Sequence, residues 1–219
     1  MGTVPFVAFT WLALPFAAQL IVAQATGQSR ECEPNPARVV DDIYQQVLER
    51  SADQASAGMT RALAAGRMTV RDLVAQLAKS PEHAEQFFWK PAVTALYRRQ
   101  LGREPDPEGL RSFTELARRD GLDAVERALL ASPEFQRRGT TAGPSGSFAQ
   151  EYEAAVRSLY RHLLGRDPDP AGLRDLTQIA QTRDFDAVVD RMLASREYQQ
   201  LYGDHVVPGR GVRYCGPTP

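Results

Sequence analysis

A motif of ten residues occurs twice in this sequence and constrains the fold more than any other feature. Residues 101–110 and 164–173 both follow the pattern Leu-Gly-Arg-x-Pro-Asp-Pro-x-Gly-Leu. Apolar residues up to and including the first leucine of each motif follow the spacing i, i+3, i+4, i+7, i+8, which places them on one face of an α-helix, and only Gln100 breaks this pattern. The sequence therefore predicts a helix, a tight corner and a second helix in both places.

Each corner carries residue types that suit helix ends. Glycine takes the left-handed conformation that ends a helix, aspartate caps the next helix, and proline suits its first turn. The arginine either binds a carboxylate or sulfate on a partner, or bonds the capping aspartate and exposed carbonyls of its own corner; we favour the second interpretation. The corner residues are Gly102, Arg103, Asp106, Pro107 and Gly109, and Gly165, Arg166, Asp169, Pro170 and Gly172.

A weaker copy of the pattern precedes these two. It keeps Arg50 and Asp53 but lacks the glycine and the prolines, so we expect a looser corner. Apolar residues at helical spacing predict a third helix in every copy, and Ser80, Ser132 and Ser195 are placed to cap a short fourth helix. The unit that repeats is about 35 residues long.

The predicted fold class is all-α, with three copies of the helix-corner-helix unit forming two helical lobes. The first two copies make one lobe at 38–137. Small polar residues at 138–148 predict a flexible linker, the third copy follows at 149–205, and turn-forming residues predict an irregular tail at 206–219.

The amino-terminal segment carries the pattern of an export signal. An apolar stretch ends in Ala23-Gln24-Ala25, the small-x-small pattern of a cleavage site, so residues 1–25 are predicted to be a signal peptide and 26–37 a short tail. The alternative is an uncleaved membrane anchor, because the apolar run is long enough to span a bilayer. Both interpretations place the rest of the chain outside the cytoplasm.

The two cysteines, Cys32 and Cys215, lie near opposite ends of the chain. An exported protein meets oxidising conditions, so we expect a disulfide between them. Spacing alone does not fix pairing, and two unrelated surface thiols remain the alternative.

Charge and motifs exclude several function classes. The 26 basic and 27 acidic residues nearly cancel, which gives no support for nucleic-acid binding, and a membrane is expected to be involved only through the amino-terminal segment. His83, His162 and His205 have no zinc-ligand spacing, and no nucleophile or nucleotide-binding motif is present. No catalytic residue, metal or cofactor is therefore predicted. The acidic corners suit capping better than calcium binding, because prolines alternate with the acids.

The aromatic run Phe87-Phe88-Trp89 has two interpretations. As core it packs the first lobe against the second, or it forms an exposed interaction patch of the kind that protein interfaces favour. We favour the core and keep the patch as a candidate site.

Three parts of the sequence resemble a known family. Residues 66–80, the Leu-Gly-Arg corners and residues 195–208 resemble the phycobilisome linker domain, and the corner is also similar to a related bacterial domain of unknown function in surface and secreted proteins. The resemblance implies an all-helical module that holds larger assemblies together by protein contacts, with no recognised catalytic residues. No attached chromophore is implied, since neither cysteine lies in the repeats. Phycobilisomes lie on the cytoplasmic side of the membrane, which conflicts with the predicted export.

Taken together, the sequence favours a non-catalytic structural or interaction protein that is exported to the periplasm, cell surface or medium. Its expected partner is a protein or an extracellular polymer. One alternative is an intracellular phycobilisome-type assembly linker. Another is a carbohydrate-processing or metal-dependent accessory enzyme that uses the acidic corners.

Overall fold

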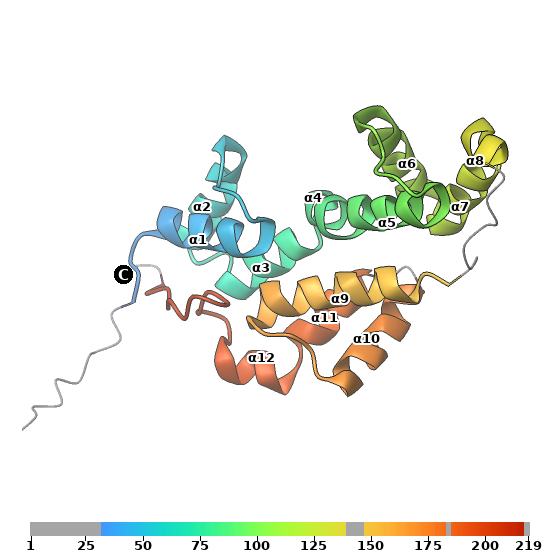
Figure 1. The fold of residues 1–219 in the computed structure, drawn as a ribbon. Helices are drawn as coiled ribbons and strands as arrows, with labels where there is room; N and C mark the ends of the chain where they lie inside the picture. Colours follow the sequence, from blue (N-terminus) through green and yellow to red (C-terminus); the bar gives the residue numbers. More distant parts are fainter. Residues whose placement is uncertain (1–31, 139–146, 183–184, 217–219) are drawn as a thin grey trace, which may run out of the picture. The chain divides into compact units, whose positions relative to one another are not determined.

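Short helices joined by tight corners make up the described chain (Figure 1). The computed structural model describes residues 32–138, 147–182 and 185–216, and these residues contain helices but no β-strand. The prediction of an all-helical fold is confirmed. No helix among the described residues is both long enough and apolar enough to cross a membrane.

The helices follow one another in three sets of the same order, which we call the first, second and third helical sets. The first contains α1 (Pro36–Leu48), η1 (Gln54–Ser56), α2 (Ala57–Ala64), α3 (Val70–Ala78) and α4 (Pro81–Ala84). The second contains α5 (Lys90–Leu101), α6 (Pro107–Asp120), α7 (Leu122–Leu130) and α8 (Pro133–Arg138). The third contains α9 (Ala149–Leu164), α10 (Pro170–Gln181), α11 (Phe185–Leu193) and α12 (Arg196–Leu201). The first set alone runs from Pro36 to Ala84, so the predicted unit length of about 35 residues is too short. That the sets are copies of one unit, and that they divide into two lobes, stay predictions.

Local sequence explains where these helices begin and end. Gly102 and Gly165 end α5 and α9 in the left-handed conformation, with φ of 61° and 68°. Asp106 and Asp169 cap α6 and α10, and a proline occupies the first turn of each. Thr69 begins α3 with a reciprocal capping box.

The first and second sets are joined by helical backbone without a break. Between α4 and α5 lies a π-helical segment, η2 (Glu85–Trp89). Pro91 follows it at the start of α5 and has no backbone N–H to donate to the carbonyl four residues earlier, against which its ring would also collide. A wider π-helical turn before Pro91 accommodates both effects.

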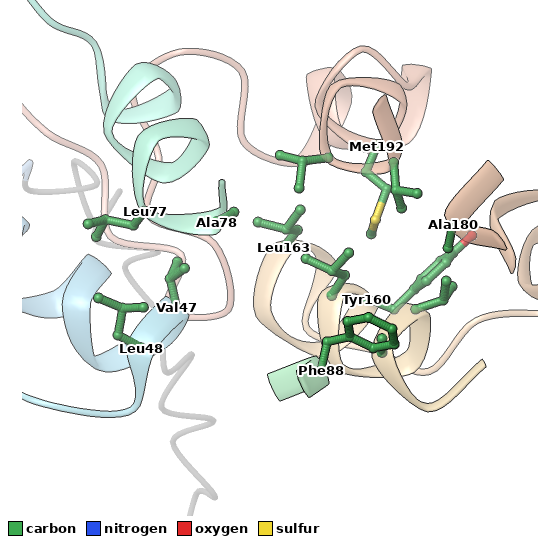
Figure 2. Packing of buried hydrophobic residues seen from close by; sticks show 14 of the residues in the cluster. Val47, Leu48, Leu77, Ala78, Phe88, Tyr160, Leu163, Ala180 and Met192 are labelled. Atoms are coloured by element: carbon green, nitrogen blue, oxygen red, sulfur yellow. The ribbon is translucent and has the colours of Figure 1, made fainter. Parts of the chain in front are cut away.

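A shared core connects the three sets. Buried apolar side chains of α1, α3, η2, α9, α10 and α11 belong to one cluster, and Figure 2 labels members from each of these elements. Helices α9 and α11 of the third set contact α1 and α3 of the first, while η2 and α5 contact α9. The third set therefore packs against both of the others.

The aromatic run belongs to this shared core. Phe88 is 3% exposed, and its ring centroid lies 5.2 Å from that of Tyr152 and 4.3 Å from that of Phe185. Phe87 and Trp89 are half-buried on either side. Of the two alternatives for this run, core packing describes Phe88, which a partner cannot reach without opening the junction.

After α12 the chain crosses from the third set to the first without forming a helix. Val207 and Tyr214 are buried, and Tyr214 lies opposite Glu33 in an isolated β-bridge. The structure joins Cys32 to Cys215 in a disulfide with a Cα–Cα distance of 4.9 Å. The two ends of the described chain are therefore held together.

Candidate functional site

The three corners share an arginine that reaches the start of the fourth helix of its own set. Both Nε and Nη2 of Arg103 donate to the two carboxylate oxygens of Glu134, at 2.7 and 2.6 Å. Arg166 does the same to Glu197 at 2.6 Å for both bonds. Arg50 makes the equivalent pair with Glu82. Such two-pronged bonding fixes the direction of both side chains.

Each of these arginines also bonds its own corner and covers a tyrosine. Nη1 of Arg103 and of Arg166 donates at 2.8 Å to the carbonyl of the next residue. The guanidinium carbon lies 5.4 Å from the Tyr97 ring centroid in one corner and 5.1 Å from that of Tyr160 in the other. The arginine lowers the pKa of the paired glutamate through its hydrogen bonds. The arginines thus stabilise the corners, as favoured from the sequence, while the glutamate partners were not predicted.

The acidic corner residues serve as helix caps. Asp106 Oδ1 accepts the backbone N–H of Gly109 at 2.8 Å, and Asp169 Oδ1 accepts those of Ala171 and Gly172. These backbone hydrogen bonds lower the pKa of both carboxyl groups. Within residues 32–138, 147–182 and 185–216, no three His, Cys, Asp or Glu side chains gather closely enough to hold a metal ion.

One helical position, four residues before the corner arginine, makes contacts between sets. It is occupied by Gln46 in α1, Arg99 in α5 and His162 in α9. Gln46 Nε2 donates at 3.1 Å to the carbonyls of Arg161 and His162, which are exposed at the end of α9. The same place on three helices is therefore used for three different tertiary contacts.

A pair of buried histidines joins the first set to the third. His83 Nε2 lies 3.1 Å from His162 Nδ1, and His162 Nε2 lies 3.4 Å from Glu49 Oε1. The Phe87 ring covers His162 at a centroid distance of 4.4 Å. Burial, with the neighbouring His162, lowers the pKa of His83 to about 3. Burial also lowers the pKa of His162, although the Glu49 carboxylate opposes this. Both rings are neutral at pH 7 and share one hydrogen bond.

A second polar cluster joins α5, α7 and α9. Arg99 Nη1 donates to Glu151 Oε1 at 3.0 Å, and Gln100 Nε2 donates to Glu126 Oε1 at 2.9 Å. Arg99 Nη2 lies 3.7 Å from the same Glu126 oxygen, and the Arg99 guanidinium faces the Phe148 ring. Because all four polar side chains are mostly buried, these contacts fix how the second set meets the third.

A hollow opens in the third set between α10 and the α11–α12 turn. Its floor is formed by buried apolar side chains, among them Tyr160, Leu176 and Met192, and exposed Asp175 and Arg191 lie at its edge. In the second set Phe113 occupies the position of Leu176, and its ring packs against Tyr97 at a centroid distance of 5.5 Å. With the smaller Leu176 at this position, Tyr160 lines the hollow.

Sequence reasoning missed the histidine pair and the Arg99 cluster. His83 is the third residue after Ser80, which is the place that Phe135 takes after Ser132 and Tyr198 takes after Ser195. Aligning these short helices by their serine caps would have identified His83 as an inward-facing side chain. No sequence signal pointed to its partner His162, because the two are brought together only by packing between sets.

Comparison with known proteins matches most of the chain to one family. The model of the phycobilisome linker polypeptide matches residues 32–142 and 147–210. A phycobiliprotein ApcE of Nostoc sp. is 30% identical over 109 residues, which are 45% of this chain and 10% of that relative. The phycobilisome 31.8 kDa linker polypeptide, phycoerythrin-associated, rod, of Microchaete diplosiphon is 30% identical over 139 residues, 59% of this chain and 43% of that relative. The chain thus spans less than half the length of these curated relatives.

These matches correct the predicted location and the main predicted function. The prediction of an exported protein of the periplasm, cell surface or medium is wrong. The matching family consists of linkers of phycobilisomes, which lie on the cytoplasmic side of the membrane. The signal peptide or anchor on which export rested, residues 1–25, lies outside the described residues. Because the family model matches most of the chain, over residues 32–142 and 147–210, the chain belongs to the phycobilisome linker polypeptide family.

Proposed function

We propose that this chain is a non-catalytic assembly linker of the phycobilisome, which holds a phycobiliprotein by protein contacts. The observation that carries this proposal is the family match over residues 32–142 and 147–210, which includes all three corners. The name of one relative describes it as a phycoerythrin-associated rod linker, which gives phycobiliproteins as the first partners to test. The similarity of the corner to a bacterial domain of surface and secreted proteins adds no partner to this proposal.

The corner geometry supports a structural rather than a catalytic role. The carboxylates of Asp106 and Asp169 accept backbone N–H groups, and Glu134 and Glu197 are bound on both oxygens by arginine. A catalytic acid or base needs a proton that it can give to or take from a substrate, and these groups are held ionised by their bonds. The accessory-enzyme alternative therefore loses the residues on which it rested.

The hollow beside Leu176 is the contact site that we propose for the partner. Apolar side chains line it, and in the second set the Phe113 ring stands at the position of Leu176 and packs against Tyr97. We infer that an apolar side chain of the phycobiliprotein occupies the hollow in the same way. Buried apolar side chains at the centre of an interface carry much of the binding energy.

The matched variants Leu176→Phe and Phe113→Leu test this proposal. Leu176→Phe should fill the hollow and weaken binding of purified phycoerythrin by about tenfold, with thermal unfolding little changed. Phe113→Leu changes the same kind of side chain in the second set and should leave binding intact. Surface plasmon resonance measures both affinities. If Leu176→Phe binds like the parent chain, the hollow is not the contact; if the parent chain binds no phycobiliprotein, the assembly function is wrong.

Activity provides the separate test of the enzyme alternative. Asp106→Asn and Asp169→Asn should leave the melting temperature nearly unchanged, because asparagine caps helices about as well as aspartate. Neither the parent chain nor the variants should hydrolyse glycosides. A glycoside-hydrolysing activity that disappears in both variants while their circular dichroism is unchanged would contradict the non-catalytic proposal.

A further inference from the structure

The disulfide lies where a protein partner can reach it. Cys215 is exposed and Cys32 is half-buried, and both belong to irregular segments rather than to helices. The bridge closes a loop over a sequence separation of 183 residues. Its exposure is unlike that of a disulfide sealed inside a core, which reducing proteins reach only after unfolding.

The bridge fastens residues 202–216, here termed the C-terminal clasp, onto the first helical set. The backbone N–H of Cys215 donates to the Glu33 carbonyl at 3.1 Å, and that of Glu33 donates to the Arg213 carbonyl at 2.7 Å. Arg210 pairs with Asp42 of α1 at 2.8 Å. The two backbone hydrogen bonds join the ends of the described chain, and the ion pair joins the clasp to α1. The disulfide is the covalent link between the clasp and Cys32.

Further along, the clasp inserts side chains and follows α1 closely. Val207 is fully buried, and buried Tyr214 places its hydroxyl 3.5 Å from the carbonyl of Leu63 in α2. Gly209 has a φ of 71° and lies so close to Gln46 that a side chain at this position would collide with it. The clasp is therefore packed against α1 and α2 as well as bonded at its end.

Other contacts hold the third set to the first without the clasp. These are the His83–His162 hydrogen bond, the Lys79–Asp190 ion pair and the bonds from Gln46 to the end of α9. The shared apolar core adds to them. Loss of the disulfide therefore leaves the helical sets packed, and it acts on the clasp, which then keeps only non-covalent contacts.

We propose that Cys32–Cys215 is a reversible redox site whose reduction by a protein dithiol of the thioredoxin class opens the C-terminal clasp. The inference rests on the proposed function in one respect: a phycobilisome linker works where protein dithiols keep most cysteines reduced, and disulfides in such compartments are mostly redox-sensing or transient. It adds regulation to that function, because opening of the clasp exposes the part of the first set that the clasp covers.

The exchange follows the ordinary chemistry of thiols and disulfides. A thiolate of the reductant attacks the more exposed Cys215 sulfur, forms a mixed disulfide and displaces Cys32 as a thiolate, which takes up a proton. The second thiol of the reductant then attacks the mixed disulfide, releasing Cys215 and closing the reductant's own disulfide. Two electrons and two protons pass from the dithiol to the cysteine pair.

Thioredoxin, recycled by its NADPH-dependent reductase, is the probe for the test. After treatment of the native chain, thiol alkylation and intact mass should show both cysteines modified. Hydrogen exchange should become at least about tenfold faster at the amides of Val207, Tyr214 and Cys215, with α5–α7 unchanged. Alkylation only under unfolding conditions would overturn the proposal, as would unchanged exchange in the clasp after reduction.

The double variant Cys32→Ser/Cys215→Ser serves as the matched control. It should show the faster clasp exchange without reductant, no further response to thioredoxin, and native helicity by circular dichroism. Failure of this variant to fold would contradict release of the clasp alone. Because none of these measurements uses a phycobiliprotein, their failure is distinguishable from failure of the proposed assembly function.

Discussion

The corner of the first helical set differs from the other two at the residue that ends the preceding helix. Gly102 and Gly165 occupy this place in the second and third sets, and Glu49 occupies it in the first. Glu49 is the only non-glycine residue with a positive φ, 54°, in the described parts of the chain. A residue with a β-carbon is strained there by about 1 kcal/mol. Its carboxylate, however, lies 3.4 Å from His162 of the third set.

A second difference lies in the turn that follows. Gly109 and Gly172 leave room for the hydroxyl groups of Tyr97 and Tyr160, which a β-carbon at either glycine would meet. The first set has Ser56 instead, and its hydroxyl donates to the Asp53 carbonyl at 2.6 Å. The second and third corners thus pack closely within their own sets. The first corner packs less closely, and its Glu49 contacts His162 of the third set instead.

Acid titration of the histidine pair that the first corner faces should have the largest effect. The pKa of His83 is lowered to about 3 in the folded chain, so between that pH and about 6.5 the unfolded chain binds the proton more readily. Stability is therefore greatest above pH 6.5 and falls as the pH decreases, by about 3 kcal/mol between pH 7 and pH 4. Urea unfolding at each pH measures the free energy of unfolding.

The variant His83→Phe, which places the residue of the equivalent Phe135 position in the first set, isolates this contribution. Carboxylates such as Glu134 also lose their bonds in acid, but they are present in both proteins. The variant should therefore lose less stability than the parent over the same pH range. Parallel curves for the two proteins would mean that the buried pair does not couple the first set to the third.

The variant Gly172→Ala should show how closely the third corner is packed. The added methyl group would overlap the Tyr160 hydroxyl, and overpacking of this kind lowers stability by about 2 kcal/mol. Tyr160→Phe removes the oxygen concerned, so the double variant should recover most of the loss in thermal or urea unfolding. A loss of the same size in the Tyr160→Phe background would show that the glycine is needed for another reason.

Replacing the corner arginine tests what all three corners share. Arg166→Ala removes two hydrogen bonds to Glu197, one to the Asp167 carbonyl and the contact with Tyr160, and should lower the free energy of unfolding by about 1 kcal/mol. Arg166→Lys should recover little of this, because an ammonium group cannot bond both carboxylate oxygens in the same plane. Full recovery of stability by lysine would show that the Arg166–Glu197 pair stabilises the corner by charge alone and not by its two parallel hydrogen bonds.

The helices and two of the corners could be predicted from the sequence for physical reasons. Helical spacing of apolar residues and the Leu-Gly-Arg motif are local, and the backbone at Gly102, Asp106 and the residues between them obeys local rules. The contacts between sets could not be predicted in this way. The same helical position carries three unrelated side chains, those of Gln46, Arg99 and His162. Their hydrogen-bond partners in other sets follow only from how the sets pack.

The predicted export failed for a related reason. The export prediction used only the hydrophobicity of one short segment and the small residues that follow it. The location of the protein depends on the assembly in which the whole chain works, which that segment does not indicate. The predicted cysteine pairing rested on that export, yet Cys32 and Cys215 are bonded in a chain of a phycobilisome family. The pairing therefore needs another physical reason, which the packing of the C-terminal clasp on the first set supplies.

Glu49→Gly should have the smallest effect and test the comparison most directly. Glycine relieves the left-handed strain, and the contact with His162 is weak because the Glu49 side chain is 60% exposed, so the variant should be more stable by about 0.5 kcal/mol. The pKa of His162, followed by NMR, should fall further, because the carboxylate that opposes the effect of burial is gone. Glu49→Gln keeps the strain and removes the charge, so it should lower the same pKa without the gain in stability. If Glu49→Gly instead destabilises the chain, the Glu49–His162 contact contributes more stability than the positive φ of Glu49 costs. The first corner then stabilises the junction between the first and third sets at the expense of its own backbone geometry.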